Sequence, residues 1–198
     1  MNVNQPQVDG KTALHWAVQL HELDLAQLLV DAGANPDVVN LTDAKPLQQA
    51  VLNGSALMLR LLLEAGAEVN APQTISADTA LMIAARTGKA DTVNVLLEYG
   101  ANINAQESWD GTNVLMWAIN ENMLEVLQLL LANGADVNQV SLFVAPDTGR
   151  GFEGSPLRAR QPEEIGPVQC ATGEFTPLIF AVREGLLDAA KMLVSAGA

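Results

Sequence analysis

Two residue patterns in the chain could support chemistry, and the first is a phosphate-binding motif. Gly149, Gly151 and Gly154 have the spacing Gly-x-Gly-x-x-Gly, which in dinucleotide-binding proteins brings backbone N–H groups and a helix N-terminus against a pyrophosphate. That chemistry needs a helix directly after the glycines and an acidic residue about twenty positions further on. Here Pro156 and Pro162 follow, and the position near twenty residues on is uncharged. We therefore interpret the glycines as part of a loop and predict no nucleotide cofactor.

The second pattern consists of the histidines and the single cysteine. His15 and His21 lie six residues apart, so they do not share one face of a helix, and no carboxylate–histidine metal spacing accompanies them. Cys170 has no second cysteine with which to form a disulfide or a thiolate cluster. No serine, cysteine or lysine has a base at the spacing of a recognisable catalytic motif. The sequence therefore predicts no enzyme activity, no metal and no cofactor.

An internal repeat positions the two histidines and most of the rest of the chain. A seven-residue pattern with a central leucine recurs at residues 12–18, 45–51, 79–85, 113–119 and 176–182. The first four leucines, Leu14, Leu47, Leu81 and Leu115, are spaced by 33, 34 and 34 residues, and Leu178 follows after 63. A fixed period of this length indicates stacked helical units, each of which buries its apolar face against its neighbours.

Each period predicts two short helices with defined ends. In four of the five repeats, the first helix follows a residue that can cap a helix N-terminus: Thr12, Thr79, Asn113 and Thr176. The first helices end at residues that tolerate the left-handed backbone: His21, Gly54, Gly88, Asn122 and Gly185. Four second helices begin with an acidic residue, which complements the helix dipole: Asp24, Asp91, Glu125 and Asp188. Every second helix ends in Gly-Ala, which predicts positive φ at Gly66, Gly100 and Gly134.

These motifs resemble the ankyrin repeat. Residues 12–17, Thr-Ala-Leu-His-Trp-Ala, match the ankyrin pattern Thr-Pro-Leu-His-x-Ala, and the ending Gly-Ala-x-x-Asn is intact at residues 66–70, 100–104 and 134–138. The resemblance covers nearly the whole chain except about residues 140–172. It implies a mainly α solenoid of helix–turn–helix units joined by short β-hairpins, with a structural hydrogen-bonding role for His15. It also implies protein–protein recognition along a concave groove and the hairpin tips.

The repeats divide the chain into one array with an insertion. We place the repeats at about residues 9–40, 41–73, 74–107, 108–139 and an incomplete 173–198, and a loop or hairpin insertion at residues 140–172. The insertion holds four of the nine prolines and a cluster of positive charge at Arg150, Arg158 and Arg160. A long loop in a solenoid is functional or disordered. We expect it to leave the array on the hairpin side, with its two ends held together.

The aromatic residues are the main candidates for partner contact. Trp16, Trp117 and Phe180 occupy one repeat position, which Gln49 and Ile83 fill in the other repeats, and Trp109 precedes repeat four on its hairpin. In the geometry that the resemblance implies, this position lines the groove, and large aromatic side chains are typical binding anchors. The alternative is that these rings fill gaps between adjacent repeats. We predict partner binding at Trp16, Trp109, Trp117 and Phe180, with Arg150, Arg158 and Arg160 as a secondary patch.

Charge limits the class of partner. The chain has 10 basic and 23 acidic residues and a net charge of −13, so it would repel nucleic acid and anionic membranes. We predict a protein partner, with basic or apolar partner surfaces favoured, although acidity also simply keeps an elongated surface in solution. The chain shows no signal peptide or apolar membrane-spanning run, so the compartment is not identified and the cytoplasm is favoured.

The two ends of the chain lack the polar substitutions of capping repeats. Val3-Asn4 matches Val69-Asn70, so the first residues are interpreted as the end of a preceding repeat and the chain as a segment of a longer array. Exposed apolar helix faces then predict self-association of the isolated segment. Two other functions stay open: a regulatory or scaffolding segment of a larger protein whose catalytic domain is absent here, and a purely architectural spacer.

Overall fold

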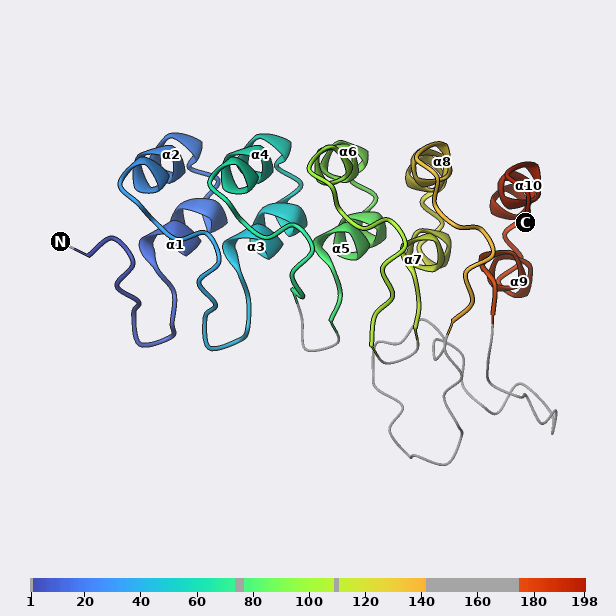
Figure 1. Ribbon diagram of the computed structural model, residues 1–198, viewed down its shortest axis with the longest axis horizontal. Coiled ribbons are helices and arrows are strands. Elements are labelled where there is room, and N and C mark those ends of the chain that lie inside the picture. Colours follow the sequence, from blue (N-terminus) through green and yellow to red (C-terminus); the bar gives the residue numbers. More distant parts are fainter. Residues whose placement is uncertain (1, 74–76, 109–110, 142–174) are drawn as a thin grey trace, which may run out of the picture.

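The computed structural model describes residues 2–73, 77–108, 111–141 and 175–198, and these residues form ten helices and no sheet. The helices fall into pairs that stack in two layers (Figure 1). One layer contains α1 (Ala13–Gln19), α3 (Pro46–Asn53), α5 (Ala80–Thr87), α7 (Val114–Asn120) and α9 (Pro177–Arg183). The other contains α2 (Leu23–Asp31), α4 (Ala56–Glu64), α6 (Ala90–Glu98), α8 (Leu124–Ala132) and α10 (Leu187–Ser195). The predicted mainly α solenoid is confirmed.

The helix ends follow the local rules read from the sequence. The side-chain oxygens of Thr79, Asn113 and Thr176 accept the N–H groups of the third residue of α5, α7 and α9 at 3.4, 3.0 and 3.3 Å. The left-handed backbone predicted after each first helix is present even where the residue is not glycine, with φ of 60° at His21 and 55° at Asn122. The predicted positive φ after the second helices is also confirmed, at 93°, 81° and 83° for Gly66, Gly100 and Gly134.

The core lies between the two layers and runs through consecutive repeats. The central leucines of the first four repeats are at most 1% exposed, and the alanine three positions later is fully buried in all five repeats. The small alanine side chains allow the inner helices to approach closely, and each inner helix contacts the next one along the array. Because each helix has only seven to nine residues, its stability depends on this packing rather than on its own hydrogen bonds.

Asparagine side chains connect consecutive repeats at the ends of the second helices. Asn70 donates from Nδ2 to the Gly100 carbonyl at 3.0 Å and accepts the Asn102 N–H at 2.7 Å. Asn4 makes the same pair of bonds, to the Gly33 carbonyl at 3.0 Å and from the Asn35 N–H at 2.7 Å. The first residues of the chain therefore occupy the place of a repeat end, as the match of Val3-Asn4 to Val69-Asn70 predicted.

The connections between repeats are hairpin-like loops rather than regular β-hairpins. Within the described residues the single β-bridge is the antiparallel pair Gln106–Asn113. Two backbone bonds close the second loop, from Asn40 N–H to the Ala44 carbonyl and from Asp43 N–H to the Asn40 carbonyl, each at 3.1 Å. Backbone hydrogen bonds also join neighbouring loops. The Leu41 N–H donates to the Asp9 carbonyl of the preceding loop at 3.0 Å.

Residues 142–174, which include most of the insertion, lie outside the described residues, but the residues on their two sides are in contact. The Ser141 N–H donates to the Phe175 carbonyl at 3.0 Å, and the Phe175 N–H donates to Ser141 Oγ at 3.1 Å. Helix α7 packs on α9, and α8 packs on α10, in the same way as the helices of the earlier repeats. The expected closeness of the two ends of the insertion is confirmed.

Candidate functional site: the inner-helix surface and the loop tips

Trp16 is a partly exposed aromatic side chain that is held in place by its neighbours. Its Nε1 donates to Gln7 Oε1 at 3.3 Å, and Lys11 Nζ lies 4.5 Å from the centroid of its ring. Lys11 Nζ also donates to Gln19 Oε1, at 3.2 Å. The first loop and α1 thus fix the ring in one orientation while part of it faces solvent. A rigid aromatic ring of this kind loses little conformational entropy when a partner covers it.

Trp117 and Phe180 occupy the same repeat position as Trp16 but are buried. Trp117 is 7% exposed and Phe180 is fully buried. Arg86 Cζ lies 5.4 Å from the centroid of the Trp117 ring, and Arg183 Cζ lies 5.1 Å from that of Phe180. These contacts favour the packing alternative at both positions. A partner would first meet the guanidinium groups that lie over the rings.

The inner helices expose a different position, three residues after the aromatic one. We call this set the inner-helix row: Gln19, Leu52, Arg86, Asn120 and Arg183. Asn120 is partly buried and the other four are exposed. The sequence analysis missed this row, although its residues follow Trp16 and its equivalents at i+3 and so lie on the same helix face. Among the described residues, Arg86 of this row and Lys89 are the cations without an acidic partner.

Several predicted contact residues cannot be placed. Trp109, Arg150, Arg158 and Arg160 lie outside the described residues, as do Cys170 and the glycine motif at residues 149–154. Their roles remain predictions from the sequence. The described part of the site therefore consists of Trp16, the inner-helix row and the loop tips.

His15 is buried and has a structural environment. The Thr12 N–H and Oγ1 lie 3.1 and 2.9 Å from His15 Nδ1, and His15 Nε2 lies 3.3 Å from the Ala44 carbonyl oxygen. This pattern fits a neutral ring in which Nδ1 accepts and Nε2–H donates to the next loop. Burial lowers the pKa of His15 below its usual 6.5, and Lys11 lowers it further, against the raising effect of the Ala44 carbonyl. The ring joins repeat one to the loop of repeat two, as the resemblance implied.

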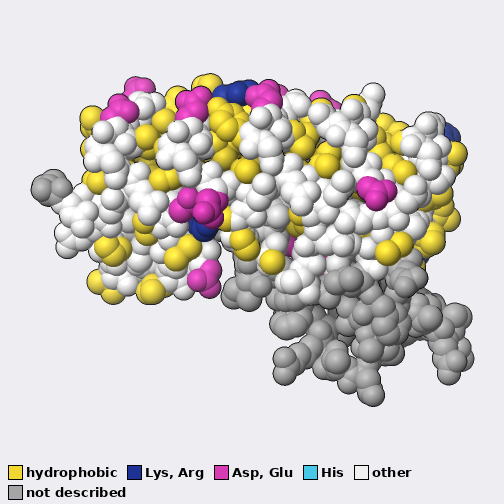
Figure 2. All heavy atoms as spheres, viewed as in Figure 1, with side chains coloured by type: hydrophobic (Ala, Val, Ile, Leu, Met, Phe, Trp, Pro, Cys, Tyr) yellow, Lys and Arg dark blue, Asp and Glu magenta, His cyan; other side chains and the backbone are white. Residues whose placement is uncertain are grey.

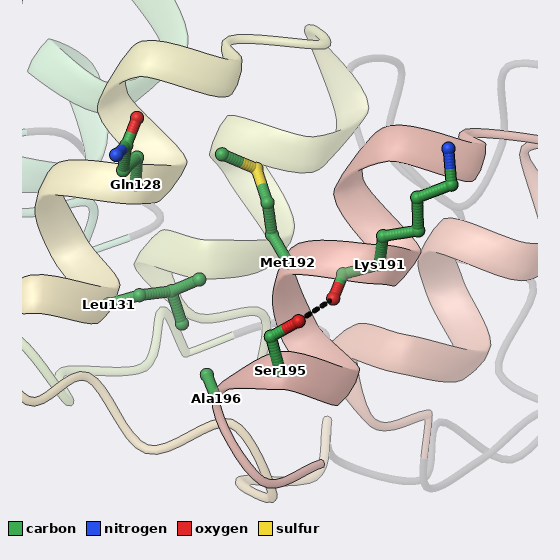
Figure 3. A pocket seen from close by; sticks show the side chains of 6 residues that line it. All are labelled: Gln128, Leu131, Lys191, Met192, Ser195 and Ala196. Atoms are coloured by element: carbon green, nitrogen blue, oxygen red, sulfur yellow. Dashed lines mark hydrogen bonds between the residues drawn. The ribbon is translucent and has the colours of Figure 1, made fainter.

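The described residues contain little that could hold a small ligand. They contain no group of three or more His, Cys, Asp or Glu side chains that could bind a metal. A hollow of about 370 Å³ lies between α8 and α10, lined by Gln128 and Leu131 on one side and by α10 on the other (Figure 3). Ser195 Oγ donates to the Lys191 carbonyl at 2.8 Å, and Lys191 Nζ pairs with Asp188 at 3.1 Å. The hydroxyl and ammonium groups that line the hollow are thus already paired within α10.

Every described helix is too short or too polar to cross a lipid bilayer.

The stacked helix pairs, the left-handed glycines and the asparagine bonds between repeats define a solenoid of repeated helix–turn–helix units. The family description "ankyrin repeats (3 copies)" matches residues 1–73 and 47–141, and the chain belongs to the ankyrin repeat family. The human ASB11 ankyrin repeat domain has the same fold, with a TM-score of 0.72 over 100% of this chain and 74% of that domain, at 23% identity. Ankyrin repeats are in general protein–protein interaction modules, and the fold is typically non-catalytic.

Curated relatives share part of the array. The chain is 37% identical over 76 residues to the E3 ubiquitin-protein ligase KEG of Arabidopsis thaliana, and 36% identical over 77 residues to Protein PhlB of Serratia liquefaciens. It is 37% identical over 81 residues to the human ankyrin repeat and SOCS box protein 16. These matches cover 38%, 39% and 41% of this chain, but only 5%, 34% and 18% of the three relatives.

Proposed function

We propose that this chain binds another protein through the surface formed by its inner helices and loop tips. The observation that carries the proposal is the inner-helix row, in which five successive repeats present one side chain each at the same helical position. Trp16 lies one turn earlier on the same face and is partly exposed. A repeated, rigid surface with an aromatic group and one cation without an acidic partner, Arg86, provides patterned contacts.

A second proposal concerns the context of this module. The relatives at 36–37% identity are much longer than the matched part, and one of them is a ubiquitin ligase by name. This supports the hypothesis that the array recruits or regulates a partner on behalf of a larger protein. An architectural spacer is the remaining alternative, and it predicts that substitutions in the inner-helix row have no effect on binding.

A matched pair of charge reversals tests the proposed surface. Arg86→Glu and Lys89→Glu make the same change in net charge at the two described cations that have no acidic partner, but only Arg86 lies in the inner-helix row. The intact chain and both variants would be used to capture proteins from a lysate of the source organism, with mass spectrometry as the readout. A partner lost with Arg86→Glu and with Trp16→Ala but retained with Lys89→Glu supports the proposal. A partner that both charge reversals weaken equally responds to net charge alone and would count against it.

Self-association is also proposed, because the outer repeats expose positions that the inner repeats bury. Leu28 is 64% exposed, whereas its equivalent Leu61 in repeat two is 7% exposed. At the other end Val182 is 64% exposed, whereas its equivalent Ile119 is 1% exposed. In the inner repeats a neighbouring repeat covers these positions. The two end faces therefore present apolar surface that a flanking repeat or a second copy could cover.

A further inference from the structure

The tips of the first two loops, which precede α1 and α3, carry apolar side chains where turns normally carry polar ones. Val8 is 100% exposed and Leu41 is 75% exposed, and the two residues lie 33 positions apart at the same place in their loops. Figure 2 shows apolar side chains at the lower left of the molecule, over these first loops. By sequence spacing, Ile75 and Trp109 stand at the same repeat position, although both lie outside the described residues. Turn tips favour Gly, Asn, Asp and Ser, so the apolar residues at the two described tips have no local explanation.

Val8 and Leu41, which we call the tip pair, are held in a defined relative position. The Leu41 N–H donates to the Asp9 carbonyl at 3.0 Å, so the backbone next to Val8 is bonded to the backbone of Leu41. Gly10 permits this approach: its φ is 79°, and a Cβ there would lie 2.9 Å from both Asn40 Cα and Leu41 N. A contact surface fixed by backbone bonds requires little ordering when a partner binds.

The tip pair lies beside an open hollow. The hollow has a volume of about 600 Å³ and is lined by Gln7, Val8, Asp9 and Leu41. The hollow is shallow, and the surface that lines it is almost entirely apolar, so an apolar side chain placed against it would lose contact with water without leaving a polar group unpaired. Neither Val8 nor Leu41 belongs to the buried core, so the fold itself does not require them to be apolar.

The loops of the tip pair carry two carboxylates and two cations, and the cation of the second loop, Lys45, pairs with Asp37 at 3.5 Å. Asp9 and Asp43 lie on the same two tips, and Asp43 is exposed. The cation of the first loop, Lys11, is directed to Gln19 at 3.2 Å and to the Trp16 ring at 4.5 Å, and lies 4.0 Å from Asp9. An apolar pair beside carboxylates complements apolar side chains that are flanked by lysine or arginine.

We propose that the tip pair is a docking site for a protein segment in which apolar side chains alternate with basic ones. This inference rests on the proposed protein-binding function and names the chemistry of the partner. The backbone-fixed tips provide the apolar contact, and the carboxylates select the flanking charge. Because the tips lie at the ends of the loops, the segment would cross them from one repeat to the next.

Labelled short peptides of equal length test the proposal by fluorescence anisotropy. The first alternates leucine with lysine, the second leucine with glutamate, and the third serine with lysine. The intact chain is compared with a Val8→Ser/Leu41→Ser double variant. The control is Leu57→Ser/Leu187→Ser, which removes two apolar side chains that are each 66% exposed on helices α4 and α10. All four substitutions are at exposed positions, and circular dichroism verifies that each variant is folded.

We expect the leucine–lysine peptide to bind the intact chain and the control variant equally, and to bind the tip variant at least about tenfold more weakly, as when a contact anchor is removed. Equal binding by the tip variant would overturn the inference. So would equal binding of the serine–lysine or leucine–glutamate peptide, or no binding of any peptide. If Trp16→Ala, and not the tip variant, abolishes binding, the docking site is wrong while the proposed function survives. A partner captured in the earlier experiment would likewise support that function alone.

Discussion

Two glycines with nearly identical backbone angles separate the conformational role of glycine from its steric role. Gly10 has φ of 79° and Gly100 has φ of 81°, so alanine must adopt the left-handed conformation at either position. A Cβ at Gly100 would have no neighbouring atom within 4 Å, whereas at Gly10 it would lie 2.9 Å from the backbone atoms Asn40 Cα and Leu41 N. These backbone atoms cannot rotate away as a side chain could, and the bond from Leu41 to Asp9 holds them in place.

The magnitudes follow from this difference. The left-handed conformation costs alanine about 1–2 kcal/mol. The lower entropy of the unfolded alanine chain offsets about 0.4–1 kcal/mol of that. We therefore expect Gly100→Ala to lower the free energy of unfolding by about 1 kcal/mol. Gly10→Ala adds an overpacking term of about 1–3 kcal/mol, for a total of roughly 2–4 kcal/mol.

Urea denaturation followed by circular dichroism measures both variants against the unchanged chain, and an unchanged m value shows that the same surface unfolds. Because single repeats can open locally, amide hydrogen exchange in α1 and α5 shows whether the loss is confined to one end. If both variants lose the same stability, the close contact at Gly10 does not contribute and the reasoning is refuted. A larger loss at Gly100 would contradict it more strongly.

Four further outcomes are expected. Because the fold lowers the pKa of His15, the unfolded chain takes up a proton first, and the free energy of unfolding should fall as the pH drops below 6.5. Urea titrations at several pH values should show a smaller fall for His15→Gln. Asn70→Ala removes two bonds between repeats and should cost about 1–2 kcal/mol of unfolding free energy, more than Asn102→Ala, whose side chain accepts only the local Asn104 N–H. Val182→Glu should reduce self-association in light scattering, whereas Leu57→Glu, also at an exposed residue, should not. Replacing residues 142–174 by a short Gly-Ser turn should leave α9 and α10 folded by circular dichroism, because Ser141 and Phe175 are already bonded; loss of their helical signal would contradict this.

The sequence alone determined the features that depend on neighbouring residues in the chain. The repeat of 33 or 34 residues, the buried leucines, and the left-handed residues at helix ends were all predictable, including the unusual φ of 60° at His21. The buried leucines and the left-handed residues result from helical periodicity and local backbone preference, which a single repeat displays on its own. The period follows from comparing the repeats along the chain. The family resemblance followed from the same local signals.

Only the tertiary structure decided which repeated positions face solvent. Trp16 and Phe180 occupy the same repeat position, yet Trp16 is partly exposed and Phe180 is fully buried. Side chains of adjacent repeats and loops determine that difference, and the spacing within one repeat contains no information about them. The sideways bond from Leu41 to Asp9 likewise joins two loops 32 residues apart. The proposed site therefore combines Trp16 with the inner-helix row and the loop tips, because exposure is a property of the stacked array and not of the single repeat.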